Sequence, residues 1–109
     1  MNLFQCKIEN GLAKISDMQI NLNNSLNIQN ACIGFRPDDI LISDQGEYSS
    51  SANLVEYLGS DMIIYSSVGG QEFSCKLSSK INLKAGDNFK FNISPSVLHI
   101  FDNTSGQRV

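Results

Sequence analysis

The stretch that decides the fold is Ala31–Ile40, which reads Ala-Cys-Ile-Gly-Phe-Arg-Pro-Asp-Asp-Ile. Its first half is apolar and typical of a strand. Pro37 ends that strand, because proline has a fixed φ, has no amide hydrogen and keeps the preceding Arg36 extended. The two aspartates that follow suit the first turn of a one-turn helix, where carboxylates meet free N–H groups. Gly34 predicts a bulge or the close approach of another segment. We therefore expect a sharp corner here, and corners are more often structural than catalytic.

Alternating apolar and polar side chains predict short strands before this corner. Leu3–Glu9 has the period-two pattern of a half-buried strand. Asn10–Gly11 supplies the two positive-φ residues of a type I′ turn into a returning strand, Leu12–Ser16. The pattern then repeats on both sides of Asn23–Ser25, a cluster of turn-forming residues, so we expect a second hairpin there.

The second half of the chain predicts a three-stranded meander and two further strands. We expect a bend near the serines at 49–51, and a central strand covered on both sides, because residues 62–65 are all apolar. No window has a helical period of useful length. The predicted strands are Ala52–Leu58, Asp61–Val68, Gln71–Leu77, Asn88–Ile93 and Val97–Phe101. Many short strands separated by Gly and Asn turns favour an all-β fold, either a small barrel of the oligonucleotide/oligosaccharide-binding (OB) type or a sandwich.

Length and composition limit what the chain can do. The 109 residues suit one domain, spanning 1–109. The net charge of −3, without a basic run, argues against nucleic acid as a partner. The three cysteines lie far apart in apolar patterns and are expected to be buried, unpaired thiols of a reducing compartment. No apolar run is long enough for a membrane span or a secretion signal, so we expect a cytoplasmic domain.

Few residues are candidates for chemistry. His99 is the only histidine and has no partner at ligand spacing, so no metal site is expected. Asp38 and Asp39 are adjacent and would point apart on a turn, which favours capping over acid–base work. Arg36 could hold an anion or a partner's carboxylate, although an exposed or locally paired arginine is more usual. No glycine-rich phosphate loop is present, and the aromatic residues are interpreted as core because no basic residues are interleaved with them.

Four ordered segments carry a family resemblance: Ile33–Ile40, Leu54–Gly59, Lys84–Asp87 and Leu98–Arg108. Their order and spacing resemble the C-terminal domain of ABC-importer ATPase subunits, in the sugar and glycerol-phosphate branch of the maltose-importer type. Asp38 stands where that family often has Glu, and residues 10–31 match only loosely. In the family this segment is an OB-like barrel, called a TOBE domain, which follows the nucleotide-binding domain and helps to dimerise and regulate the ATPase.

The resemblance implies a non-catalytic domain from a longer subunit. ATP and magnesium would belong to the absent ATPase domain, and this chain is expected to bind no cofactor. The implied partners are a second copy of the subunit, the importer's membrane subunits and a regulatory protein, at the inner face of the cell membrane. The interface or structural corner would include Arg36, Pro37, Asp38 and Glu56, with Arg36 paired to a carboxylate within the barrel or across a dimer, either Glu56 or a nearby aspartate. The alternative is a small oxyanion-binding barrel of the molybdate type, and a weaker third class is single-stranded nucleic-acid binding.

Overall fold

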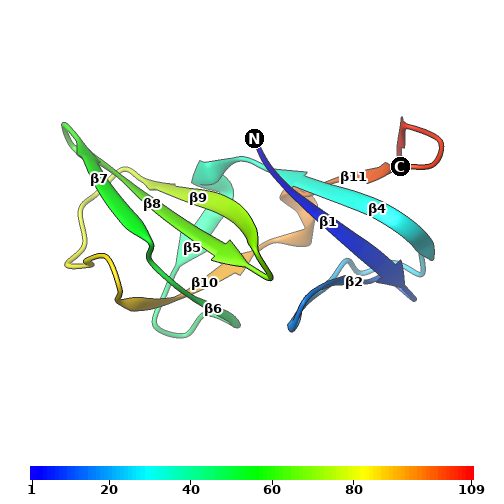
Figure 1. Cartoon of the computed structure of the whole chain (residues 1–109), viewed down its shortest axis with the longest axis horizontal. Coiled ribbons are helices and arrows are strands. Elements are labelled where there is room, and N and C mark those ends of the chain that lie inside the picture. The colour runs from blue at the N-terminus through cyan, green and yellow to red at the C-terminus, as the bar shows by residue number, and fades with distance from the viewer.

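The computed structural model describes all residues, 1–109, and consists of strands joined by turns and two short 3-10 helices (Figure 1). The molecule is elongated, measuring 40 × 23 × 23 Å. The predicted all-β class is confirmed, as a small barrel-like domain. The elements are β1 (Asn2–Glu9), β2 (Leu12–Ile15), β3 (Met18–Asn21), β4 (Ile28–Phe35), η1 (Pro37–Asp39), β5 (Ile40–Ile42), β6 (Tyr48–Ser51), β7 (Leu54–Leu58), β8 (Asp61–Val68), β9 (Gln71–Leu77), β10 (Asn88–Ile93), η2 (Pro95–Val97), β11 (His99–Asp102) and β12 (Gln107–Arg108).

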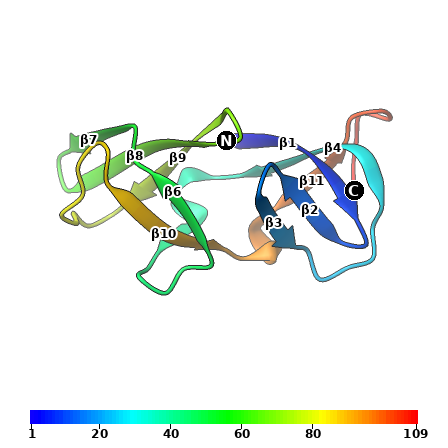
Figure 2. The same cartoon turned by 60° about the horizontal axis from the view of Figure 1, so that its bottom comes forward.

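The strands form three antiparallel sheets. One sheet has the order β12-β11-β4-β1-β2-β3, the second is β5-β10-β6, and the third is the predicted meander β7-β8-β9 with β8 in its centre. The meander lies at one end of the molecule, and β1, β2, β4 and β11 lie at the other (Figures 1 and 2). The strands β3 and β6 are each the last strand of their sheet.

Phenylalanine rings from all three sheets meet in one core. Phe4 of β1 lies 5.5 Å from Phe73 of β9, and Phe73 lies 5.5 Å from Phe91 of β10, measured between ring centroids. Phe35 of β4 packs on Phe4 at the same distance. These four side chains are buried. The prediction that the aromatic residues form the core is confirmed for these phenylalanines and wrong for Tyr57, which is 54% exposed. The packing of the phenylalanines joins the sheets into one body.

The first predicted hairpin is confirmed and the second is wrong. Asn10 and Gly11 have φ values of 48° and 75°, as a type I′ turn requires. The next reversal comes at Ser16–Asp17, between β2 and β3, whereas β4 pairs with β1 and β11 and not with β3. Residues 22–27 form a connection, because the side chains of Asn21 and Asn24 accept hydrogen bonds from nearby backbone N–H groups.

The predicted strand Ala52–Leu58 begins two residues later than expected, at Leu54. The serine run is itself the strand β6, which pairs with β10, and β7 begins at Leu54 in another sheet. The change of sheet falls at Ala52–Asn53, slightly after the predicted bend. The predicted covering of both faces of β8 is wrong, because Met62 and Ile64 are buried while Ile63 and Tyr65 are only half-buried.

Candidate interaction surfaces

The proline corner forms as predicted. Pro37–Asp39 makes a single 3-10 turn directly after β4. The Asp39 carboxylate accepts a hydrogen bond from the backbone N–H of Arg36 at 3.2 Å, and the N–H of Asp39 donates to the Arg36 carbonyl at 3.0 Å. The expected close approach at Gly34 is also present, because an added Cβ would lie 2.7 Å from the sulfur of Met1. The corner is thus closed by its own backbone and by Asp39.

The predicted ion pair of Arg36 within the chain is wrong, and a pairing across a dimer stays a prediction. The structure has three ion pairs, Lys7–Glu9, Lys14–Glu9 and Lys76–Asp61, and Arg36 is exposed and takes part in none of them. Glu56 lies on β7, whereas the corner packs against β9 on the far side of β8. Two strand spacings of about 4.8 Å therefore lie between Glu56 and the strand beside the corner. The sequence segments suggested that Arg36 and Glu56 lie close together, whereas the fold places them apart.

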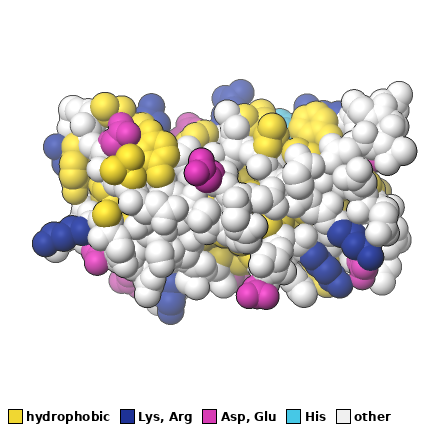
Figure 3. Space-filling model, in the orientation of Figure 1, with side chains coloured by type: hydrophobic (Ala, Val, Ile, Leu, Met, Phe, Trp, Pro, Cys, Tyr) yellow, Lys and Arg dark blue, Asp and Glu magenta, His cyan; other side chains and the backbone are white.

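The outer face of the meander carries a partly exposed apolar surface. The register places Leu54 opposite Tyr65, Glu56 opposite Ile63, and Leu58 opposite Asp61, so these side chains share one face. Leu54 and Leu58 are 50% and 53% exposed. Figure 3 shows hydrophobic side chains gathered at this end of the molecule with an acidic side chain among them. We call this surface the β7–β8 face, defined by Leu54, Glu56, Leu58, Ile63 and Tyr65.

Of the predicted interface residues, only Glu56 lies on the β7–β8 face. Leu54 and Leu58 were not predicted as exposed residues, because an apolar alternation usually indicates burial. The signal that could have found them is the apolar run at residues 62–65. An apolar run of this kind predicts a strand that is buried on both faces. In this chain only one face of β8 is buried, and the other face is partly exposed.

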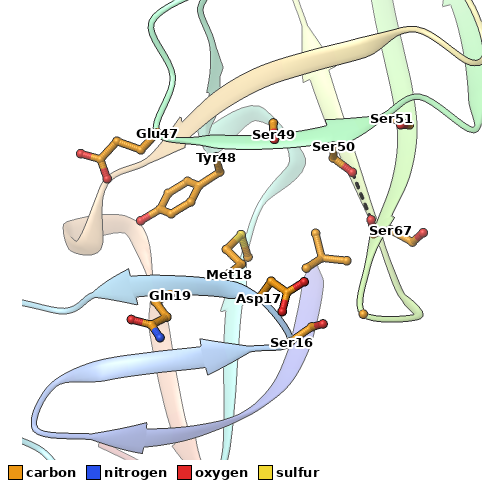
Figure 4. A pocket seen from close by; sticks show the side chains of 12 residues that line it. Ser16, Asp17, Met18, Gln19, Glu47, Tyr48, Ser49, Ser50, Ser51 and Ser67 are labelled. Carbon is orange, nitrogen blue, oxygen red and sulfur yellow. Dashed lines mark hydrogen bonds between the residues drawn. The ribbon is translucent and has the colours of Figure 1, made fainter.

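A polar groove lies between the edge strands β3 and β6 (Figure 4). It has a volume of about 660 Å³. The turns β2–β3 and β8–β9 form its end. We call it the β3–β6 groove, and its lining residues are Ser16, Asp17, Met18, Gln19, Glu47, Tyr48, Ser49, Ser50, Ser51, Ser67, Val68 and Gly69.

The remaining candidates for chemistry are His99 and the three cysteines. His99 lies on β11 opposite Gly34 and is half-buried, and no group of three or more His, Cys, Asp or Glu side chains is placed to hold a metal ion. Burial raises the pKa of the Cys75 thiol to about 12, and burial followed by the nearby Cys32 raises that of Cys6 to about 11. These thiols stay protonated near neutral pH and are poor nucleophiles. No helix is long and apolar enough to cross a membrane.

Comparison with known proteins identifies the class. No protein-family model matches the chain. The chain is 36% identical over 81 residues to the sn-glycerol-3-phosphate import ATP-binding protein UgpC of Cupriavidus pinatubonensis, a match that covers 72% of this chain and 22% of that protein. It is 27% identical over 125 residues to the oligosaccharides import ATP-binding protein MsmX of Bacillus subtilis, and 28% identical over 116 residues to UgpC 2 of Agrobacterium fabrum. Both of these matches cover the whole chain, and they cover 34% and 31% of the respective relatives.

The chain is therefore related to one segment of the ATP-binding subunits of ABC importers. Its relatives serve the import of glycerol phosphate and of oligosaccharides, as the resemblance of the four sequence segments indicated. The chain spans between about a fifth and a third of the length of these relatives.

Proposed function

We propose that this chain is the non-catalytic, C-terminal regulatory and dimerisation domain of the ATP-binding subunit of an importer for sugars or glycerol phosphate. The observation that carries the proposal is the match of most of this chain to a minor part of such subunits. In this proposal ATP and magnesium are bound by the rest of the parent protein. The parent works on the cytoplasmic side of the cell membrane, with the importer's membrane subunits.

The β7–β8 face is the surface we assign to the second copy of the subunit. Exposed leucines on a sheet face favour burial against a partner. Glu56, Ile63 and Lys76 follow one another across the three strands, so an acidic and a basic side chain lie in one row, and Lys76 also pairs with Asp61 of its own chain at 3.7 Å. A two-fold axis through this row would bring Glu56 of each copy towards Lys76 of the other. The exposed corner residues Arg36 and Asp38, with Pro37 between them, remain available to a membrane subunit or a regulatory protein.

Sedimentation of the full-length parent subunit tests this role. Changing Leu54 and Leu58 to Glu places two charges on the face, and we expect the subunit to dimerise at least tenfold more weakly. Leu41→Glu is the matched control, because Leu41 is 63% exposed on β5, outside the face. If the double variant dimerises like the wild type, the β7–β8 face is not the interface.

The alternative function is oxyanion binding, and calorimetry separates it from the first. The names of the relatives favour the accessory role, and the β3–β6 groove has no basic lining residue that would attract an anion. We expect titration of the chain with molybdate, tungstate and sugar phosphates to give no heat beyond dilution. We also expect no ATP turnover above a mock preparation, since phosphoryl transfer depends on groups that position the phosphates and the metal. Heat with molybdate would favour the alternative.

A further inference from the structure

The β3–β6 groove lies where the three sheets meet and is separate from the β7–β8 face. We propose that this groove binds a neutral polyhydroxylated ligand, a mono- or oligosaccharide, through its hydroxyl, amide and carboxylate side chains and the ring of Tyr48. This role goes beyond the docking function proposed above and does not depend on it. The volume of about 660 Å³ falls in the range of small-molecule sites, about 300–1,000 Å³.

One wall of the groove is held rigidly by buried hydroxyl groups. The hydroxyl of Ser66, which is 1% exposed, donates to the carbonyl of Ser51 at 2.6 Å. The hydroxyl of Ser50 is shared between the Ser66 hydroxyl and the carbonyl of Ser67. Figure 4 shows the bond between Ser50 and Ser67 at the back of the groove. These bonds fix β6 against β8, and a fixed wall lowers the entropy that a ligand must overcome on binding.

Other polar groups of the groove have no partner within the chain. The side chains of Asp17, Gln19 and Glu47 form no intramolecular hydrogen bond and no ion pair, and neither do the hydroxyls of Ser16 and Ser49. Carboxylates accept hydrogen bonds, whereas amides and hydroxyls both donate and accept them. A sugar hydroxyl also does both, so a row of sugar hydroxyls complements this set of groups.

The charge of the lining determines the class of ligand. Two of the twelve lining residues, Asp17 and Glu47, are acidic and none is basic. A phosphorylated or sulfated ligand would be repelled, since no lysine, arginine or histidine offsets its charge. A metal ion is disfavoured because no group of three ligating side chains is present. Because anions and metal ions are both disfavoured, the lining best suits a neutral polar ligand.

Tyr48 supplies an apolar surface beside the polar groups, whereas Met18 lines the groove but is only 9% exposed. The Tyr48 ring is half-buried against Phe91, with 5.7 Å between ring centroids, and its remaining surface lines the groove. Figure 4 shows Tyr48 from β6 and Met18 from β3 both directed into the space between these strands. An aromatic ring with a polar hydroxyl can contact the C–H face of a sugar and still form a hydrogen bond.

An extended peptide is the competing occupant, because β3 and β6 both have a free edge. Peptides that add a strand gain their specificity from pockets for alternate side chains. The groove has only three apolar lining residues, Met18, Tyr48 and Val68, and they do not form such a series. The lining therefore favours a sugar over a peptide.

Titration of the isotope-labelled chain, followed by the NMR signals of its backbone amides, tests the proposal. The probes are maltose, sucrose and trehalose at millimolar concentration, with glycerol 3-phosphate and inorganic phosphate as anionic probes and a serine-rich peptide as the strand probe. We expect at least one disaccharide to shift amides of Ser16–Gln19 and Glu47–Ser51 in a saturable manner. We expect the anions and the peptide to leave these amides unchanged.

Variants of exposed lining residues locate the site without disturbing the core. Asp17→Ala and Gln19→Ala remove groups that have no intramolecular partner, and each is expected to weaken binding about tenfold, equal to about 1.4 kcal/mol. Asp44→Ala and Gln45→Ala are the matched controls, since both residues are exposed in the loop before Glu47 and do not line the groove. No saturable shift with any disaccharide, equal binding by the Asp17 and Asp44 variants, or binding of phosphate or the peptide in this groove would each overturn the proposal.

Discussion

Two seams join the sheets of this molecule, and they are built in opposite ways. At the seam between β1 and β9, side-chain amides complete the backbone hydrogen bonding. The Asn2 amide donates to the Ser74 carbonyl at 2.8 Å and accepts from the Ser74 N–H at 2.9 Å. The Gln71 amide makes the same two bonds with the backbone of Gln5, at 2.9 and 2.7 Å. No hydrogen bond joins β3 to β6 across the other seam, which is the β3–β6 groove.

The difference shows where this fold is able to accept a partner. A strand edge is a row of backbone donors and acceptors, and a protein either satisfies that row or leaves it to water or a ligand. The β1–β9 seam uses two amides that imitate a neighbouring strand, so it is closed. The β3–β6 seam is lined by several side chains without an intramolecular partner, those of Ser16, Asp17, Gln19, Glu47 and Ser49, so it can receive a ligand without any rearrangement of the core.

Loss of the amide at Asn2 should be the most damaging change at either seam. Asn2 is 8% exposed, and Asn2→Ala leaves both backbone groups of Ser74 without their partner. Each unsatisfied group costs about 1–3 kcal/mol when buried, and Ser74 is half-buried, so we expect a loss of about 3 kcal/mol in the free energy of unfolding. Gln71→Ala removes equivalent bonds at a more exposed site and should cost about 1 kcal/mol. Urea unfolding measures both, and equal losses would show that burial at this seam is unimportant.

Substitution of two adjacent glycines, Gly69 and Gly70, tests how tightly the β8–β9 turn packs at the end of the β3–β6 groove. Gly69 and Gly70 have φ values of 57° and 78°, so alanine is strained at both positions, by about 1 kcal/mol. A Cβ at Gly69 would also lie 2.6 Å from the Cβ of Ser16, whereas nothing lies within 4 Å of one at Gly70. We expect Gly69→Ala to cost about 2 kcal/mol and Gly70→Ala about 1 kcal/mol, because only the first displaces the β2–β3 turn. Equal unfolding free energies would show that the turn yields without cost.

The first hairpin turn and the proline corner were predictable from sequence. Between two segments of alternating polarity, the pair Asn10–Gly11 usually forms a type I′ hairpin turn. Pro37 ends a strand because it has a fixed φ and no amide hydrogen. The reversal at Ser16–Asp17 was missed because Asn23–Ser25 has the stronger turn composition. There the Asn24 side chain bonds to nearby backbone and stabilises a connection instead.

The two seams themselves could not be predicted from local patterns. The bonds between Asn2 and Ser74 join residues that are 72 positions apart, and no alternation of side chains signals such a pairing. The groove is lined partly by the serine run 49–51, where a bend or bulge was predicted because the run shows no alternation of apolar and polar side chains. The run is a strand because it pairs with β10, and the buried hydroxyl of Ser66 on β8 adds hydrogen bonds to Ser50 and Ser51.

The buried thiol of Cys75 makes the stability of the protein depend on pH at the β1–β9 seam. Cys75 follows Ser74 at the closed seam, and burial raises the pKa of its thiol from its ordinary value of 9.0 to about 12. Because the folded-state pKa is raised, this contribution to stability is complete below pH 9 and is lost as the pH rises towards 12. We expect the free energy of unfolding to fall by up to about 1.4 kcal/mol per pH unit for each such thiol above pH 9.

Alkylation of Cys75 at pH 8 should be slow in the native protein and faster in the Asn2→Ala variant. The groove variant Asp17→Ala should leave the rate unchanged, since Asp17 is exposed at the other seam. Equal acceleration in both variants would mean that global unfolding, and not opening of the β1–β9 seam, exposes the thiol.

Arg36 should have the smallest effect on stability, although it lies in the stretch that ends β4. It is exposed and forms no ion pair, so Arg36→Ala should change the free energy of unfolding of the chain by at most about 1 kcal/mol. Pro37→Ala is the informative companion, because it releases the constraint on the corner that packs against β9. If Arg36 contacts a partner subunit, its variant should melt like the wild type while assembly of the full-length protein weakens in sedimentation. An Arg36→Ala protein that is unchanged in both measurements would show that this stretch matters for its proline alone, and the search for the partner surface would then move to the β7–β8 face.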